Sequence, residues 1–256
     1  MSARHPFLDF EHPIAFAHRG GSLEAEENTM EAFARAVEMG FTHVETDVHA
    51  TRDGVVVVHH DDTLERICGD GRAIAEMDWE EVSQVRTRGG AKIPRIEEVF
   101  DAFPKLCVNI ELKDARSAEP LAEILRQGDL LDRVCVGAFN PRHTAAIRER
   151  LGPNLCWSPA HLGVAGLWLK GWGVPTRRPD YPVIQVPTTF NGIPVVTPRL
   201  IRAAARWGID VQVWTVDDRA EMEALLDMGV RGIMTDRPSV LRDVLRARGQ
   251  WNTHPA

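Results

Sequence analysis

Two acidic side chains in the segment His43–Val48, HVETDV, are spaced so that they can share a metal ion. Successive side chains of a β-strand point to opposite faces, so Glu45 and Asp47 lie on one face, about 6.6 Å apart along the chain. Capping or surface carboxylates are the alternative, but a strand interior is a poor place for solvated acids. Two neighbouring carboxylates repel each other unless a cation lies between them. One divalent cation, Mg²⁺ or Ca²⁺, is the simplest occupant because hard ions prefer oxygen ligands.

Two histidines add acid–base chemistry to this carboxylate pair. His18 ends a short apolar run, and a β-branched run leads into His59 and His60. Imidazole titrates near neutral pH, so paired histidines beside carboxylates indicate a general acid and a general base. Alternation along the run points one of the two adjacent histidines inward, and we favour His60 because Asp61 follows it. Three other histidines are treated as bystanders: His12, His143 and His161.

These residues lie within an alternation of strands and helices that runs to the end of the chain. About eight barrel strands are predicted, at 14–17, 43–48, 106–112, 133–139, 154–158, 182–186, 210–216 and 232–235. This number is typical of a closed barrel of parallel strands. An open doubly wound sheet shows the same alternation, but no glycine-rich nucleotide-binding turn follows a strand. The predicted fold class is therefore α/β, a (β/α)8 TIM-type barrel forming a single catalytic domain over residues 1–256.

Two local features refine this prediction. Asn28 is followed three residues later by Glu31, which predicts a capping box with Asn28 as the N-cap of the first helix. The mixed, polar stretch 62–94 does not fit the strand–helix repeat. We expect it to form a small insertion after the second strand, over one end of the barrel.

Further polar residues fall where predicted strands end, which is where the active sites of such barrels lie. Glu111 and Lys113 end the run VNIELK two residues apart and so share a face. Lys113 is either an ion-pair partner for Glu111 or Glu45, or a substrate contact. Trp214 is either packing at the barrel mouth or a wall of the pocket. Asp236 is expected to orient a neighbour or to cap the following turn.

Bulk properties limit the partners. The net charge of −7 argues against nucleic acid, because binding a phosphate backbone needs a basic surface. The N-terminal residues lack the apolar stretch of a signal peptide, and no apolar run is long enough to span a bilayer. We therefore expect a cytoplasmic protein without stable membrane insertion. The four cysteines form no CxxC pair and are expected to be reduced, mostly buried thiols.

The segment 157–181 combines tryptophans and leucines with nearby lysine and arginine. An apolar patch rimmed with cations can lie on a membrane or hold an acyl chain. Ordinary packing of a barrel helix and its loop is the favoured interpretation, because buried apolar stretches are common. Peripheral lipid contact stays open, and the oligomeric state is not predicted.

Short motifs occur in a fixed order along the chain. They are HRG at 18–20, ENT at 27–29, ETD at 45–47, HHD at 59–61, TLER at 63–66, ELK at 111–113, WTV at 214–216 and GIMTDRP at 232–238. No single motif is specific, but the ordered set, from about residue 14 to residue 240, resembles the glycerophosphodiester phosphodiesterase family.

The resemblance implies a (β/α) barrel with a small insertion after the second strand. It also implies one divalent cation held by carboxylates, two histidines acting as acid and base, and basic residues at the phosphate. The candidate residues are His18 and His60 for catalysis, Glu45, Asp47 and Glu111 for the metal, and Arg19, Lys113 and Trp214 for the substrate. One departure is His49, where a neutral polar residue is more usual in the family. An exposed loop position is favoured for it over a contact with the site.

The implied reaction is hydrolysis of a small-molecule glycerophosphodiester to glycerol 3-phosphate and an alcohol. A lysophospholipase D or a phospholipase C-like phosphodiesterase on the same barrel is the main alternative. A Schiff-base aldolase with Lys113 as nucleophile, or a barrel that only binds a phosphorylated ligand, leaves the acidic trio and the histidine pair without a role. The head group, the ion, and which histidine is the acid are not predicted.

Overall fold

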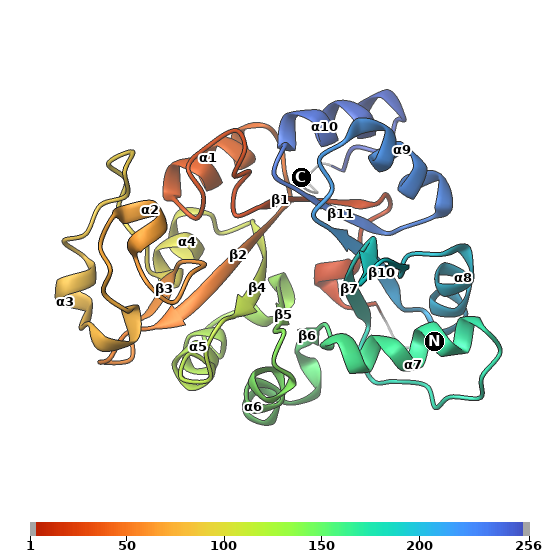
Figure 1. The fold of residues 1–256 in the computed structure, drawn as a ribbon, viewed down its shortest axis with the longest axis horizontal. Helices are drawn as coiled ribbons and strands as arrows, with labels where there is room; N and C mark the ends of the chain where they lie inside the picture. The colour runs from red at the N-terminus through yellow and green to blue at the C-terminus, as the bar shows by residue number, and fades with distance from the viewer. Residues whose placement is uncertain (1–3, 253–256) are drawn as a thin grey trace.

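A computed structural model of the protein describes residues 4–252. Eight parallel strands stand in the order β6-β5-β4-β2-β1-β11-β10-β7 and nearly close a barrel, with helices on its outside (Figure 1). The strands are β1 (Ile14–His18), β2 (His43–Ala50), β4 (Cys107–Leu112), β5 (Val134–Gly137), β6 (Cys156–Trp157), β7 (Val183–Pro187), β10 (Asp210–Trp214) and β11 (Gly232–Thr235). The predicted fold class is confirmed.

The two ends of the strand order are β6 and β7, and the ring stays open between them. β6 has only two residues. Directly after β6, a side chain makes the hydrogen bond to β7 that strand backbone would otherwise make. The backbone N–H of Gln185 in β7 donates to the hydroxyl of Ser158 at 3.0 Å. This contact bridges the two ends of the strand order and satisfies a backbone donor that a longer β6 would otherwise pair.

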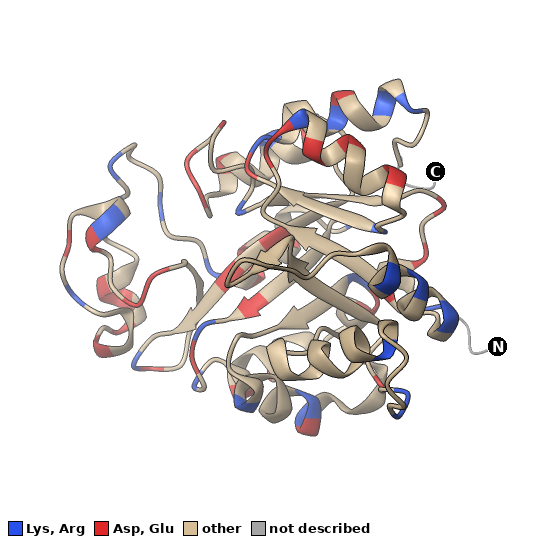
Figure 2. Cartoon of the chain, turned by 45° about the vertical axis from the view of Figure 1, so that its right-hand side comes forward, with Lys and Arg blue, Asp and Glu red and all other residues tan. Residues whose placement is uncertain are grey.

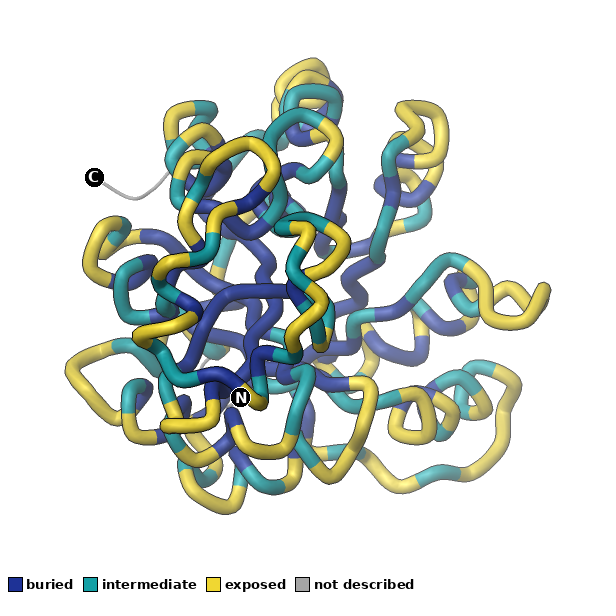
Figure 3. Tube along the Cα trace, turned by 60° about the vertical axis from the view of Figure 1, so that its left-hand side comes forward, coloured by how far each residue is buried: buried dark blue, intermediate teal, exposed yellow. Residues whose placement is uncertain are grey.

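The helices form the outer layer, and the strands that they surround are buried (Figure 3). The main helices are α1 (Met30–Glu38), α4 (Ile96–Ala102), α5 (Ala118–Leu125), α6 (Pro141–Leu151), α7 (His161–Gly171), α8 (Pro198–Trp207), α9 (Arg219–Met228) and α10 (Pro238–Ala247). The predicted alternation of strands and helices is confirmed. Within residues 4–252, no helix has both the length and the apolar character needed to cross a bilayer.

A separate apolar cluster closes the end of the barrel where the strands begin. The 3-10 helix Pro6–Leu8 carries Phe7 and Leu8 into this end, where they pack against first residues of several strands. Phe7 is fully buried, which contributes about 1.5–3 kcal/mol for one large apolar side chain. Cys107, Cys135 and Cys156 belong to this cluster, as unpaired buried thiols. The opposite end of the barrel is left open for polar side chains.

The second strand is longer than predicted. β2 continues to Ala50 because its last residues pair antiparallel with β3 (Val56–Val58), outside the ring. The chain after β3 forms the short helices α2 (Glu65–Cys68), Ile74–Glu76 and α3 (Trp79–Val82), which lie beside β3 and away from the ring (Figure 1). This segment packs around a small apolar core of its own, formed by Val57, Leu64, Ile74, Met77, Val82 and Ile93.

The prediction that Asn28 caps the first helix is wrong. The N-cap of α1 is Thr29, whose side chain accepts from the backbone N–H of Ala32 at 3.1 Å. Asn28 lies one residue earlier with a φ of 57°, in the left-handed region that asparagine tolerates. Its side chain is buried and points toward β2 instead.

Candidate active site

The carboxyl ends of β1, β2 and β4 bring the predicted acidic residues together. In the register of the sheet, His18 of β1 pairs with Glu45 of β2, and Asp47 of β2 pairs with Glu111 of β4. Alternation then points Glu45, Asp47 and Glu111 to the same side of the sheet. Each contributes one carboxylate oxygen, and these oxygens lie within 4.8 Å of one another.

This acidic cluster has the electrostatics of a site for a cation. Burial, together with the charge of Asp47, raises the pKa of Glu45 to about 8. Burial also raises the pKa of Glu111, although the charge of Lys113 opposes it. Both shifts express the cost of holding ionised carboxylates close together away from water. Three oxygen donors at this spacing fit a hard divalent cation, which would offset their repulsion.

Basic and amide groups hold the innermost carboxylate in place. Lys113 Nζ lies 3.1 Å from Asp47 Oδ1 and 3.1 Å from Glu111 Oε1. Arg19 Nε lies 3.2 Å from Asp47 Oδ2, and the amide of Asn28 donates to the same oxygen at 3.0 Å. Burial acts to raise the pKa of Asp47, but the charges of Lys113 and Arg19 outweigh it and the pKa is lowered. Lys113 therefore forms ion pairs within the cluster. Its pair with Glu111 was expected, and its pair with Asp47 was not.

His18 is held between two carboxylates. Its Nδ1 lies 2.6 Å from Oδ1 of Asp236, and its Nε2 lies 3.6 Å from Oε2 of Glu45. Burial lowers the pKa of His18, but Glu45 and Asp236 together outweigh it and raise the pKa to about 9. At neutral pH the ring is therefore protonated. The expectation that Asp236 orients a neighbour agrees with this contact.

His60 has a different environment at the same opening. Its Nδ1 lies 2.6 Å from Oδ1 of Asp61, whose other oxygen, Oδ2, accepts from Arg66. Burial lowers the pKa of His60 and outweighs the charge of Asp47 and the hydrogen bond to Asp61, which raise it. The ring is therefore neutral at neutral pH, opposite to His18. The adjacent His59 is buried, and its Nε2 is 3.1 Å from the carbonyl oxygen of Thr63, so His60 is the one that faces the site.

The turn after β1 fixes Arg19. Its φ of 51° is in the left-handed region, and its backbone N–H lies 3.2 Å from Glu45 Oε2. Its guanidinium also contacts Glu27 at 3.2 Å, so the side chain is braced from two sides. Gly20 follows with a φ of 83°, and a Cβ there would lie 2.6 Å from the Cβ of Ala32. Only glycine fits this close approach of the turn to α1.

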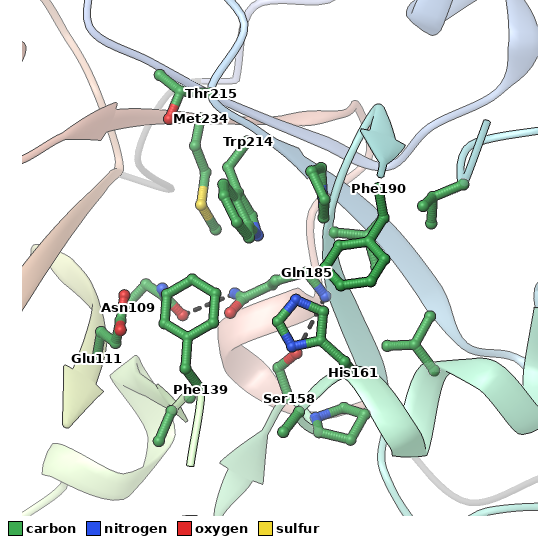
Figure 4. Close-up of a pocket in the computed structure, with 18 of the residues that line it drawn as sticks. Asn109, Glu111, Phe139, Ser158, His161, Gln185, Phe190, Trp214, Thr215 and Met234 are labelled. Carbon is green, nitrogen blue, oxygen red and sulfur yellow. Dashed lines mark hydrogen bonds between the residues drawn. The ribbon is translucent and has the colours of Figure 1, made fainter. Parts of the chain in front are cut away.

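These groups line one end of a single cavity of about 670 Å³. His18, Arg19, Glu45, His60, Glu111, Lys113 and Trp214 all border it, and Asp47 lies directly behind them. Trp214 is a wall of the pocket, where its ring meets Phe139 edge to face at 5.6 Å between centroids (Figure 4). The structure thus brings together all eight residues that the sequence singled out.

The other end of the cavity is apolar and comes from two elements that the sequence did not connect with the site. One is α7, and the other is the hairpin of β8 (Thr189–Phe190) and β9 (Ile193–Pro194). Their side chains there include Val164, Ala165, Trp168, Leu169, Phe190, Ile193 and the neighbouring Val195. The end of the cavity with the carboxylates and histidines therefore opens into an apolar compartment.

Two histidines that the sequence set aside belong to the site or its support. His161 borders the cavity, stacked on Phe139 at 5.5 Å and near Phe190 at 4.9 Å (Figure 4). His49 is buried rather than exposed, and its Nε2 is 3.2 Å from the carbonyl oxygen of His60. The position on the Glu45 face was the available signal for His49. No sequence signal pointed to His161, because its surroundings come from distant elements.

The family model, the sequence relatives and the solved structures that match this chain carry related descriptions. The model of the glycerophosphoryl diester phosphodiesterase family matches residues 18–240. The chain is 38% identical over 253 residues to the probable glycerophosphodiester phosphodiesterase 2 of Mycobacterium tuberculosis, with 96% of each chain covered. It is 27% identical over 266 residues to a lysophospholipase D of Homo sapiens, covering 90% of this chain and 85% of that one. The crystal structure of a glycerophosphodiester phosphodiesterase from Agrobacterium tumefaciens has the same fold, with a TM-score of 0.76 at 22% identity, covering 91% of this chain and 99% of that one.

Proposed function

The chain belongs to the glycerophosphoryl diester phosphodiesterase family, and we propose that it cleaves glycerophosphodiesters by metal-dependent, two-histidine acid–base catalysis. Its activity as a glycerophosphodiester phosphodiesterase follows from that membership. The proposed chemistry rests on one observation: two imidazoles with opposite pKa shifts border the same cavity as three clustered carboxylates. The products are glycerol 3-phosphate and an alcohol.

The proposed metal ligands are Glu45, Asp47 and Glu111. Their spacing and the raised pKa of Glu45 support one divalent cation, Mg²⁺ or Ca²⁺, at this position. Such an ion supplies positive charge against the phosphoryl oxygens, where negative charge grows in the transition state. Arg19 and Lys113 border the same opening and add their own positive charge to bind the phosphate. Trp214 forms an apolar wall beside it.

The two histidines are assigned by their protonation. His60 is the general base, because its Nδ1 is engaged by Asp61 and its Nε2 is left to accept a proton from the attacking hydroxyl. The attacking group is the glycerol 2-hydroxyl of the substrate: its oxygen forms a bond to phosphorus as the bond to the alcohol oxygen breaks, and water then opens the resulting cyclic phosphate to glycerol 3-phosphate. His18 is the general acid, and its Nε2 gives a proton to the departing alcohol oxygen. Each transfer contributes about 10²–10⁴-fold to the rate.

The test is product release from a panel of glycerophosphodiesters with different head groups. Glycerol 3-phosphate is measured by an enzyme-coupled assay in the presence of Mg²⁺ or Ca²⁺. We expect stoichiometric release of glycerol 3-phosphate and alcohol by the wild type. Release of free glycerol, with the phosphate group left on the alcohol, would contradict the proposed bond cleavage.

A second candidate substrate is a lysophospholipid, and the apolar end of the cavity favours it. Side chains of α7 and of the β8–β9 hairpin provide a compartment that a polar glycerophosphodiester does not need. A chain of CH₂ groups gains about 0.8 kcal/mol for each group buried there. Relative kcat/KM on lysophosphatidylcholine and glycerophosphocholine separates the two substrates. Preference for the first would assign lysophospholipase D activity, and preference for the second would restrict the enzyme to deacylated diesters.

A further inference from the structure

Exposed apolar side chains are concentrated on one part of the surface. Eight large hydrophobic side chains are exposed in residues 4–252, and six of them lie between residues 162 and 193. These six are Leu162, Leu169, Trp172, Val174, Phe190 and Ile193. Leu162 is 86% exposed and Ile193 is 57% exposed. Scattered exposed leucines need no explanation, but a cluster of this kind marks an interaction surface.

Four of these side chains, those of Leu162, Leu169, Phe190 and Ile193, line one cavity, and further contacts connect α7 with the β8–β9 hairpin. The indole N–H of Trp168 in α7 donates to the carbonyl of Pro194 in the β8–β9 hairpin at 3.3 Å. Trp168 also contacts Trp172, with 5.6 Å between ring centroids. Phe190 of the hairpin lies 4.9 Å from His161 at the start of α7. We call the exposed surface of α7, the β8–β9 hairpin and the adjoining helix α8 the α7–α8 face.

The α7–α8 face is also strongly basic. Residues 157–209 contain six lysines and arginines and a single acidic residue, a net charge of +5 in a chain whose total is −7. The acidic residue, Asp180, is paired with Arg148 of α6. In Figure 2 the basic residues appear as blue bands along α8, which contains no acidic residue. This segment therefore presents positive charge on an otherwise acidic protein.

Four of these cations line a cavity of about 250 Å³ between α7 and α8: Lys170, Arg199, Arg202 and Arg206. In the described part of the chain, none of the four has a carboxylate partner. Instead, Arg199 lies over the ring of Trp172 at 3.9 Å and Lys170 over that of Trp207 at 5.5 Å. The helices approach closely at Gly171, where a Cβ would lie 3.1 Å from the backbone of Arg199. The packing thus holds the cations together without neutralising them.

We propose that the α7–α8 face docks on an anionic phospholipid bilayer. Apolar side chains with a basic rim are the combination by which proteins lie on anionic membranes. The apolar side chains enter the boundary between headgroups and acyl chains, and the cations contact the headgroup phosphates. Leu162, Leu169, Phe190 and Ile193 also border the active-site cavity, so docking brings the mouth of that cavity to the bilayer. This inference does not depend on the proposed catalytic roles, because binding is measured without turnover.

The experiment is co-sedimentation of the full chain with vesicles, in the presence of EDTA. Vesicles of equal parts phosphatidylglycerol and phosphatidylcholine are compared with vesicles of phosphatidylcholine alone. We expect binding to the anionic vesicles only, with an affinity that falls steeply as salt is added. Absence of binding to the anionic vesicles would overturn the proposal.

Two matched variants locate the contact. K170Q/R202Q/R206Q removes three cations of the face, and we expect binding on the order of a hundredfold weaker. R219Q/R242Q/R248Q makes the same change in net charge on α9, on α10 and directly after α10, at arginines that have acidic partners, and should bind like the wild type. Equal loss in both variants would show a general charge effect and overturn the assignment.

The apolar part is tested with L162S/I193S, whose circular dichroism spectrum checks folding. Weaker vesicle binding by this variant supports the proposal, and unchanged binding contradicts insertion of these side chains. Sedimentation velocity is run in parallel without lipid. A dimer of the wild type that L162S/I193S abolishes, together with no vesicle binding, would identify a second copy of the chain as the occupant instead.

Discussion

Replacing Asp236 with asparagine should lower the pKa of His18, the proposed general acid. Asp236 keeps His18 protonated through a 2.6 Å contact between Oδ1 and Nδ1. Both side chains are largely buried, 16% and 19% exposed, so solvent screens the contact little. A hydrogen bond to a charged group contributes about 1.5–3 kcal/mol. At 1.36 kcal/mol for each pKa unit, Asp236→Asn should lower the pKa of His18 by about one to two units.

The assay is the pH dependence of kcat/KM. Under the proposed mechanism, activity of the wild type needs His60 neutral and His18 protonated, so it should fall at low pH and again at high pH. In Asp236→Asn the alkaline limb should move to lower pH by about one to two units, while the acidic limb stays in place. Asp243→Asn is the control, because it removes an exposed carboxylate of α10 without contact to His18. An alkaline limb that coincides with that of the wild type, in folded protein, would refute the role of Asp236.

The same change has a signature in stability. Because the pKa of His18 in the folded protein lies above its ordinary value of 6.5, its contribution is fully present below pH 6.5 and fades as pH rises through about 9. The loss in the free energy of unfolding caused by Asp236→Asn should therefore be largest, about 1.5–3 kcal/mol, below pH 6.5. Urea unfolding at several pH values measures it. A loss that is constant with pH would mean that Asp236 acts by packing alone.

Three further variants address the other groups of the site. His60→Ala should lower kcat by about 10²–10⁴-fold with an unchanged circular dichroism spectrum, and near wild-type turnover would remove His60 from the mechanism. Asp61→Asn removes a carboxylate whose hydrogen bond raises the pKa of His60, so the acidic limb of the kcat/KM profile should move to lower pH. Glu111→Gln should weaken Mn²⁺ binding at least about tenfold, because one of three charged oxygen ligands is lost; electron paramagnetic resonance measures free Mn²⁺, and unchanged affinity would place the ion elsewhere.

Much of the site could be predicted because its residues are related by short-range rules. Strand alternation was sufficient to put Glu45 with Asp47, and Glu111 with Lys113, on common faces. The barrel then required the carboxyl ends of parallel strands to meet, which brings β1, β2 and β4 together. The same alternation required only one of His59 and His60 to face inward, and the Asp61 that follows favoured His60. These inferences needed no knowledge of how helices pack.

The residues that were missed depend on contacts between distant parts of the chain. Asn28 and Thr29 are both good N-caps, and only the contact of Asn28 with Asp47 decides between them. His49 is buried by the return of the chain at His60. The apolar end of the cavity arises where α7 meets the β8–β9 hairpin; the apolar character of segment 157–181 was visible in the sequence, but its place beside the site depends on this contact. Burial and tertiary contacts of this kind override local preference.

The most direct test of the central claim is turnover of a glycerophosphodiester before and after removal of divalent ions. Protein stripped with EDTA should be inactive, and Mg²⁺ or Ca²⁺ should restore its activity while leaving the Glu111→Gln variant impaired at the same ion concentration. Full activity in thoroughly chelated protein would contradict a cation held by Glu45, Asp47 and Glu111.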